Sequence, residues 1–63
     1  MKYYQNNKSG KVYVVVSPLV FNATNAQDGQ QMVLYHLKDS AAQTYVREYN
    51  EFHEKFTLLG EEV

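Results

Sequence analysis

The sequence contains no cysteine, and only one proline and three glycines among its 63 residues. Without cysteine, the chain forms neither a disulfide nor a thiolate metal site. A chain of this length is one domain, and it buries only roughly 60% of the surface that its unfolded form exposes. Its stability must therefore come from a compact aromatic core, from oligomerisation, or from both.

Excess charge of either sign and long apolar runs are also missing. Lys and Arg number 6 and Asp and Glu number 7, which gives a net charge of -1 and no general attraction to nucleic acid or to an anionic membrane. No apolar run approaches the roughly 20 residues of a membrane span. The N-terminal "MKYYQNNKSGK" lacks the apolar segment of a signal peptide. We therefore expect no membrane contact, and a cytoplasmic location in the producing or host bacterium.

Aromatic residues, in contrast, are abundant: the chain has six Tyr and three Phe. A Tyr ring adds a large apolar area, but its hydroxyl group needs a hydrogen-bond partner or water. So many Tyr residues in a small domain suggest half-buried rings at the rim of a core, or a contact surface.

Alternating apolar residues predict several short strands. The segment "KVYVVVSP" is rich in β-branched residues, and Pro18 should end its pairing because proline has no N–H to donate. Turn-forming residues separate the strands, with Asp28-Gly29 as the tight turn of the longest loop. The expected strands are 1–4, 11–18, 30–38, 44–48 and 57–59; the expected connections are 6–10, 22–30 and 39–43.

The period changes after residue 48. Tyr49, Phe52 and Phe56 recur at the spacing of a short helix, with Asn50 as its N-cap and Glu51 and Lys55 as a favourable pair. The pattern predicts a mainly β fold, a small SH3-like β-barrel with one short helix near the C-terminus. A helix packed on a three- or four-stranded sheet is the alternative. Residues 1–59 should form the domain and residues 60–63 a flexible polar tail. The expected core residues are Val14, Val16, Leu34, Val46, Phe52 and Phe56.

The order of these segments resembles a family of small bacterial and phage proteins, DUF1653. The resemblance spans roughly Gly10 to Phe56, and its motifs are the strand that starts Gly10-Lys11-Val12-Tyr13, then "MVLYHLKD", "YVRE" and "EFHEKF". Here Glu48 stands where the family pattern has proline, and Lys38-Asp39 replaces a Gly-Asp turn. The resemblance implies a small SH3-like barrel and no particular activity.

Groups that could carry chemistry do not converge in the sequence. His36 and His53 lie far apart, and each lacks the second and third partners that a metal or an acid–base site needs. The carboxylates of Glu48, Glu51 and Glu54 fit a solvated helix face better than a catalytic pair. We therefore expect no enzyme activity, no cofactor and no metal.

The expected function is that of a small protein-binding module, such as a phage-encoded modulator that masks or recruits a host protein. Tyr and Arg concentrate the binding energy of protein interfaces. The only Arg, Arg47, either pairs with Glu51 or Glu54 or lies in such an interface. The expected partner-binding residues are Tyr3, Tyr4, Tyr13, Tyr35 and Arg47, or else the loop 22–29; the same set could form a homodimer through a strand edge.

The rival function is single-stranded nucleic-acid binding. Lys and Tyr residues are interleaved near the N-terminus, where bases could stack on the rings while the ammonium groups contact phosphates. The residues expected to take part are Lys2, Lys8 and Lys11 with Tyr3, Tyr4 and Tyr13.

Overall fold

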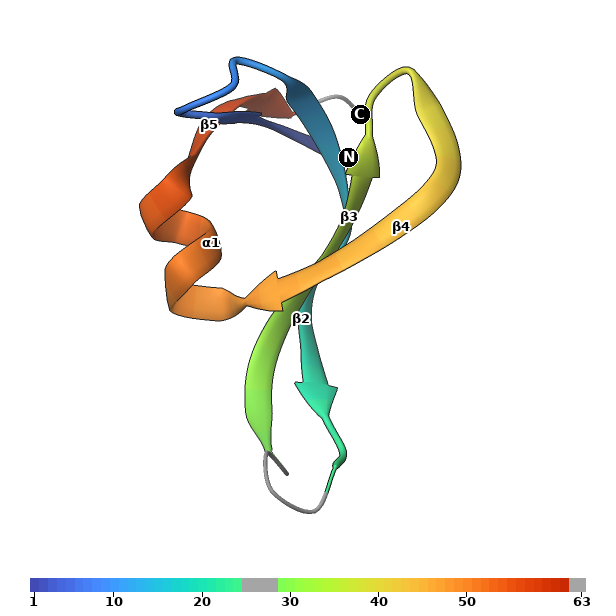
Figure 1. Ribbon diagram of the computed structural model, residues 1–63, viewed down its shortest axis with the longest axis vertical. Helices are drawn as coiled ribbons and strands as arrows, with labels where there is room; N and C mark the ends of the chain where they lie inside the picture. Colours follow the sequence, from blue (N-terminus) through green and yellow to red (C-terminus); the bar gives the residue numbers. More distant parts are fainter. Residues whose placement is uncertain (25–28, 62–63) are drawn as a thin grey trace.

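A computed structural model describes residues 1–24 and 29–61 of the chain. They form one helix and five antiparallel strands, and the strands make a single sheet of order β4-β3-β2-β1-β5 (Figure 1). The mainly β class and the short helix near the C-terminus are confirmed. The elements are β1 (Lys2–Asn6), β2 (Val12–Asn22), β3 (Gln30–Leu37), β4 (Ser40–Glu48), α1 (Tyr49–Lys55) and β5 (Phe56–Glu61).

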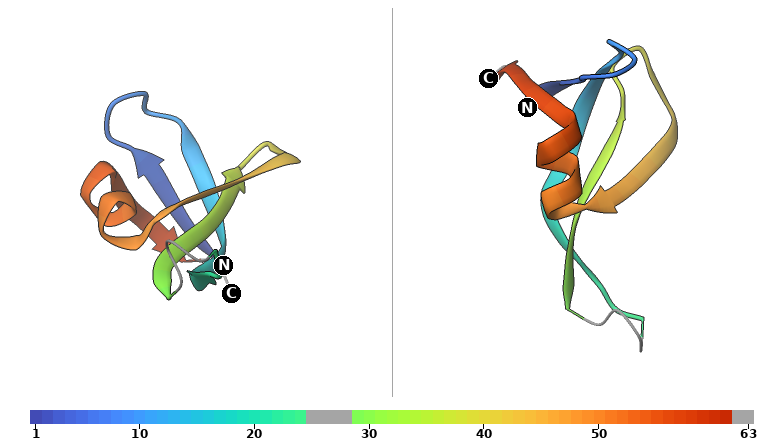
Figure 2. Two further views of the ribbon diagram at one scale, coloured as in Figure 1. Left: turned by 60° about the horizontal axis from the view of Figure 1, so that its bottom comes forward. Right: turned by 60° about the vertical axis from the view of Figure 1, so that its left-hand side comes forward.

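The sheet bends strongly but stays open. Its two outer strands, β4 and β5, do not pair with each other in the described part of the chain. Instead α1 connects them and covers the concave side of the sheet, as both views in Figure 2 show. No helix in residues 1–24 and 29–61 is long and apolar enough to cross a membrane.

Strand β2 continues past Pro18, where we expected its pairing to end. The last residue of β2 that pairs with β1 is Val15, opposite Lys2. Beyond it, the ladder with β3 shifts register twice, between Val15 and Ser17 and between Ser17 and Val20. Proline is tolerated at such irregular, edge-like positions because no neighbouring strand needs its N–H. β2 and β3 therefore project beyond the helix as a two-stranded arm, along the 33 Å long axis of the molecule (Figure 1).

The core is an aromatic cluster between the sheet and α1. Phe52 is fully buried, and its ring stacks on that of Phe56 with 4.3 Å between centroids and 9° between planes. The rings of Tyr4 and Tyr35 meet Phe52 at 5.0 and 5.1 Å. The buried members are Tyr4, Val15, Val33, Tyr35, Phe52 and Phe56, with Tyr13, Tyr45 and Tyr49 packed against them.

The predicted core was partly wrong. Val14, Phe52 and Phe56 are buried and Leu34 is half-buried, but Val16 and Val46 are exposed. Val16 lies in the first register shift of the β2–β3 ladder. The pairing of β1 with β2 ends at Val15, so β1 does not extend alongside Val16. Val46 pairs with Leu34 on an edge strand, on the sheet face opposite the helix.

The ends of several elements also differ from the prediction. The helix begins at Tyr49, and its N-cap is Glu48 rather than Asn50. The hairpin between β3 and β4 turns at Lys38-Asp39, and the extra residues 41–43 lie within β4 as a register shift. Gly60 and Glu61 pair with β1 instead of belonging to a free tail, because β1 offers them an open edge. Residues 62–63 and Asp28 lie outside the described residues.

We predict that Phe52→Ala lowers the free energy of unfolding by about 3–5 kcal/mol, which is near the whole stability of so small a domain. Chemical denaturation monitored by circular dichroism measures this. Phe52→Leu, which keeps most of the volume, should cost less than about 1.5 kcal/mol. Val46→Ala is the control and should change stability by at most about 0.5 kcal/mol. Equal losses for Phe52→Ala and Val46→Ala would contradict the proposed core.

Candidate protein-contact site

The five residues expected to bind a partner do not form one surface. Tyr4 and Tyr35 are buried in the aromatic cluster, and half-buried Tyr13 packs against it. Tyr3 pairs with Val14 and lies on the sheet face opposite the aromatic cluster. There the ammonium group of Lys38 is 5.6 Å from the centroid of the Tyr3 ring. Most of the Tyr excess thus builds the core.

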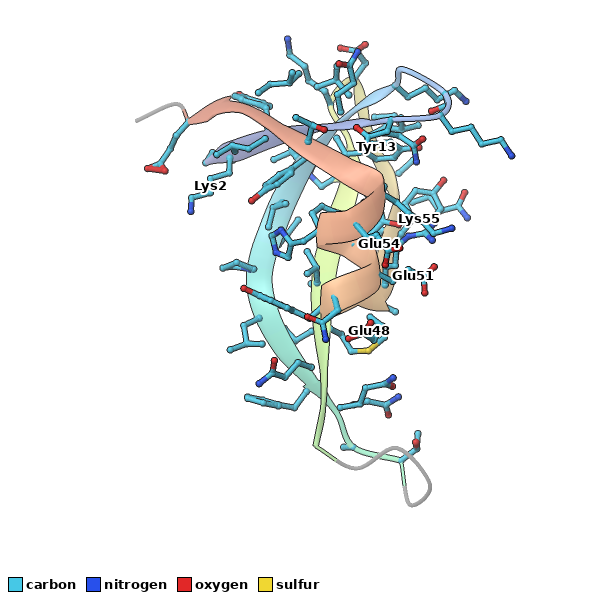
Figure 3. The ribbon with its side chains drawn as sticks, turned by 90° about the vertical axis from the view of Figure 1, so that its left-hand side faces the viewer. Lys2, Tyr13, Glu48, Glu51, Glu54 and Lys55 are labelled. Carbon is cyan, nitrogen blue, oxygen red and sulfur yellow. The ribbon has the colours of Figure 1, made fainter. Side chains whose placement is uncertain are left out.

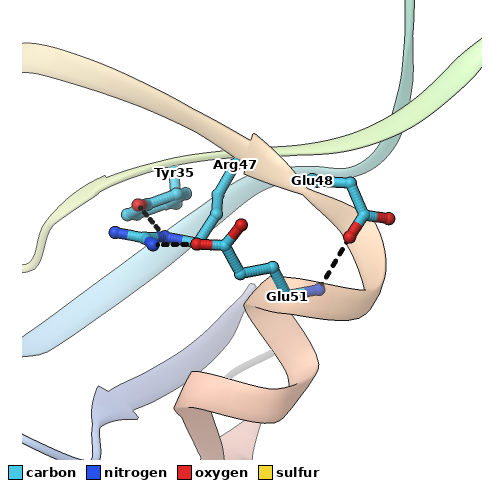
Figure 4. A network of polar contacts seen from close by, with 4 residues as sticks. All are labelled: Tyr35, Arg47, Glu48 and Glu51. Carbon is cyan, nitrogen blue, oxygen red and sulfur yellow. Dashed lines mark hydrogen bonds and ion pairs between the residues drawn. The ribbon is translucent and has the colours of Figure 1, made fainter.

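Arg47 joins the sheet to the helix. Its Nε donates a hydrogen bond to the hydroxyl of Tyr35 at 3.1 Å, and its NH1 group pairs with the carboxylate of Glu51 at 2.7 Å (Figure 4). The guanidinium carbon also lies 5.7 Å from the centroid of the Phe56 ring. Pairing of Arg47 with Glu51, one of its two expected roles, is confirmed. The hydrogen bond to Tyr35 is the main cause that raises the pKa of Arg47 above its ordinary value.

Glu48 caps the helix with its side chain. Its two carboxylate oxygens accept hydrogen bonds from the backbone N–H groups of Asn50 and Glu51, both at 2.9 Å. These bonds, that from Asn50 first, lower the pKa of Glu48 below its ordinary value. Glu48, Glu51 and Glu54 therefore have separate positions: one caps the helix, one pairs with Arg47, and the exposed Glu54 lies beside Lys55 (Figure 3).

The two histidines lie in separate surroundings. His36 Nδ1 lies 2.7 Å from the carbonyl oxygen of its own neighbour, Leu37. His53 is exposed, and its ring packs against Tyr49 at 4.6 Å. Within residues 1–24 and 29–61, no three His, Cys, Asp or Glu side chains are grouped closely enough to hold a metal ion.

The lysines expected to bind nucleic acid are also dispersed. Lys2 begins β1, whereas Lys8 and Lys11 lie at the hairpin turn beyond its other end. Figure 3 shows Lys2 on the far side of the molecule from Lys55 and Glu54. Tyr4, which was expected to stack on a base, is buried.

The largest exposed apolar side chains instead include three on the free half of β2. Val16 is 54% exposed, Leu19 43% and Phe21 61%. They lie on the arm formed by β2 and β3, where Val20 and Phe21 pair with Met32 and Gln31. We call this set, Val16, Leu19 and Phe21, the apolar arm. It adjoins the 22–29 loop, which was the second contact surface expected from the sequence; residues 25–28 lie outside the described residues.

The prediction from the sequence missed this site because it ended the strand at Pro18, whereas β2 continues to Asn22. The available signal was the apolar triplet Leu19-Val20-Phe21 directly after the proline. Comparisons with family models, with curated proteins and with solved structures gave no match. The resemblance to DUF1653 therefore stays a prediction.

We predict that the Glu48 cap makes stability sensitive to acid. Because its pKa is lowered in the folded state, its contribution is present above the ordinary Glu pKa and is lost as the pH falls through the lower, folded value. The urea midpoints of the parent and of Glu48→Gln should therefore differ at about pH 7 and converge towards about pH 2. Glu54→Gln, which removes an exposed carboxylate, is the matched control and should show little pH-dependent difference. A parent–Glu48→Gln difference that is constant or grows in acid would exclude the capping role.

Proposed function

We propose that this chain is a protein-binding module whose contact surface is the apolar arm. The observation that carries the proposal is the position of Phe21. All nine aromatic residues lie in the described part of the chain, and Phe21 is the only one of them that is exposed. It lies on a projecting arm, away from the cluster that holds the other two Phe rings.

The apolar arm has the properties of an interface anchor. Single exposed apolar residues are normal, but Val16, Leu19 and Phe21 follow one another within six positions of one strand. A Phe side chain provides a large apolar area with few rotatable bonds, so it is well suited to fill a pocket on a partner. The arm itself is held by the ladder between β2 and β3, which limits the entropy lost on binding.

We propose a binding function rather than catalysis because the charged groups at the start of the helix have structural roles. Arg47 and Glu51 bond each other, and Glu48 caps the helix. In this proposal the chain is a phage-encoded modulator that masks or recruits a bacterial host protein. It would act in the cytoplasm and without a cofactor. Nucleic-acid binding through Lys2, Lys8 and Lys11 is the rival function that the experiment below distinguishes.

We also propose that the open sheet is an SH3-like barrel that is incompletely closed. Two features support this relationship. The strand order β4-β3-β2-β1-β5 brings the first and last strands together, and a short helix connects β4 to β5 where the sheet would close. The helix α1 also contacts β3, β4 and β5, so it spans the gap between the two outer strands.

We predict that affinity capture from a bacterial lysate, with nuclease treatment, recovers a protein partner in stoichiometric amount at both low and high salt. Replacing Leu19 and Phe21 by Ser should abolish recovery, because the apolar contacts with the partner are lost. Such contacts, unlike contacts to phosphates, do not weaken steeply with salt. Val46→Ser is the control, because Val46 is 56% exposed and lies outside the arm.

Both variants should fold like the parent, which circular dichroism and thermal unfolding verify. Recovery that is unaffected by Leu19→Ser/Phe21→Ser would reject the apolar arm. In a parallel capture without nuclease, recovery of nucleic acid alone, lost at high salt and in Lys2→Ala/Lys8→Ala/Lys11→Ala, would establish the rival function.

A further inference from the structure

A second surface lies beside the helix, and it is polar and concave. A hollow of about 340 Å³ opens between the turn after β1, the end of β4 and the last turn of α1. We call it the basic hollow, because three of its lining side chains carry positive charge and one carries negative charge. It is lined by Asn6, Asn7, Lys8, Arg47, Glu54 and Lys55.

The positive charges of the hollow are only partly neutralised. The sequence suggested a pair between Glu51 and Lys55, but Glu51 instead pairs with Arg47 at 2.7 Å. Within residues 1–24 and 29–61, neither Lys8 nor Lys55 has an ion-pair partner. Counting Glu51 and Glu54 against the three cations leaves one uncompensated positive charge at the hollow.

Arg47 is already oriented and still has donors to offer. Of the five N–H groups of a guanidinium, one donates to Tyr35 and one to Glu51. Three N–H groups thus have no protein acceptor in the described part of the chain. Because Tyr35 and Glu51 hold the guanidinium above the Phe56 ring, little side-chain entropy remains to be lost when a ligand binds.

The rim of the hollow is held by hydrogen bonds between the turn and the helix. Asn7 donates from its backbone N–H to the carbonyl of Lys55 at 2.9 Å, and from its side chain to the carbonyl of Glu54 at 3.5 Å. The side chain of Asn7 also accepts a hydrogen bond from the hydroxyl of Thr57. These bonds satisfy carbonyl groups at the negative end of the helix, which would otherwise repel an anion.

We infer that the basic hollow binds carboxylate side chains of an acidic peptide segment. A carboxylate matches the single uncompensated charge and accepts paired hydrogen bonds from the guanidinium of Arg47. A polyphosphate chain is a poorer match, since its higher charge would meet Glu51 and Glu54, and since Lys2 lies on the far side of the molecule (Figure 3). The inference goes beyond the proposed function, because the hollow shares no residue with the apolar arm.

Titration of the intact protein with hexaglutamate, followed through its backbone amide resonances at low salt, tests this site. We expect saturable shifts at residues 6–8, 47, 54 and 55, with hexaglutamine causing none. Lys8→Gln/Lys55→Gln should weaken binding about tenfold, and Glu54→Gln should strengthen it about twofold to fivefold. Lys2→Gln/Lys38→Gln is the matched control, because it removes the same charge from outside the hollow and should leave the affinity within about twofold.

Equal weakening by the two lysine pairs would overturn the site, because it would mean attraction to overall charge alone. Absence of saturable shifts would overturn it too. Tighter binding of inorganic phosphate or of a short oligothymidylate than of hexaglutamate would contradict the assignment to carboxylates. None of these results depends on the apolar arm, so the proposed function and this inference are tested separately.

Discussion

The stacking of Phe52 on Phe56 is the contact on which the rest of the structure depends. Phe52 belongs to α1 and Phe56 begins β5, so the stack fixes the direction in which the chain leaves the helix. Both rings also meet Tyr35 on β3, at 5.1 and 5.3 Å. An open sheet needs a cover on its concave side, and a chain without cysteine has no disulfide to hold that cover, so the helix depends mainly on this packing.

This core determines which residues remain for contacts with other molecules. Tyr4 and Tyr35 serve the cluster, and the hydroxyl group of Tyr35 accepts a hydrogen bond from Arg47. Arg47 therefore holds the edge strand against the helix and also brings a positive charge to the basic hollow. The arm of β2 and β3 extends beyond the cover that α1 provides (Figure 2). Phe21 on this arm is exposed to solvent. The helix α1 thus covers the core on one side and contributes Glu54 and Lys55 to the basic hollow, whereas the apolar arm lies beyond it.

Local patterns in the sequence predicted the elements better than their surroundings. The Tyr49, Phe52, Phe56 spacing located the helix to within one residue, because one apolar side of a short helix must meet the core. Alternation alone could not tell which face of β2 meets the helix. Val15 rather than Val16 faces the cluster, because the register shift at this point and the start of β1 at Lys2 decide what is covered.

The candidate site was harder to predict, because it depends on what the fold leaves uncovered. The excess of Tyr indicated a contact surface, yet these rings fill the core of a sheet that has few aliphatic residues facing the helix. Pro18 signalled the end of a strand, but it lies where β2 has no neighbour on that side, so its missing N–H is not needed. Exposure of Leu19 and Phe21 follows from that continuation of β2, which no local pattern reports.

Photo-crosslinking from position 21 tests most directly whether the apolar arm is the contact surface. A photoreactive phenylalanine analogue at position 21 is irradiated in a bacterial lysate. It is compared with the same analogue at position 46, which is similarly exposed but lies on the outer strand β4. We predict one dominant protein adduct from position 21 and none from position 46. Adducts of the same pattern from both positions, or an adduct from position 46 alone, would contradict the claim that the apolar arm is the contact surface.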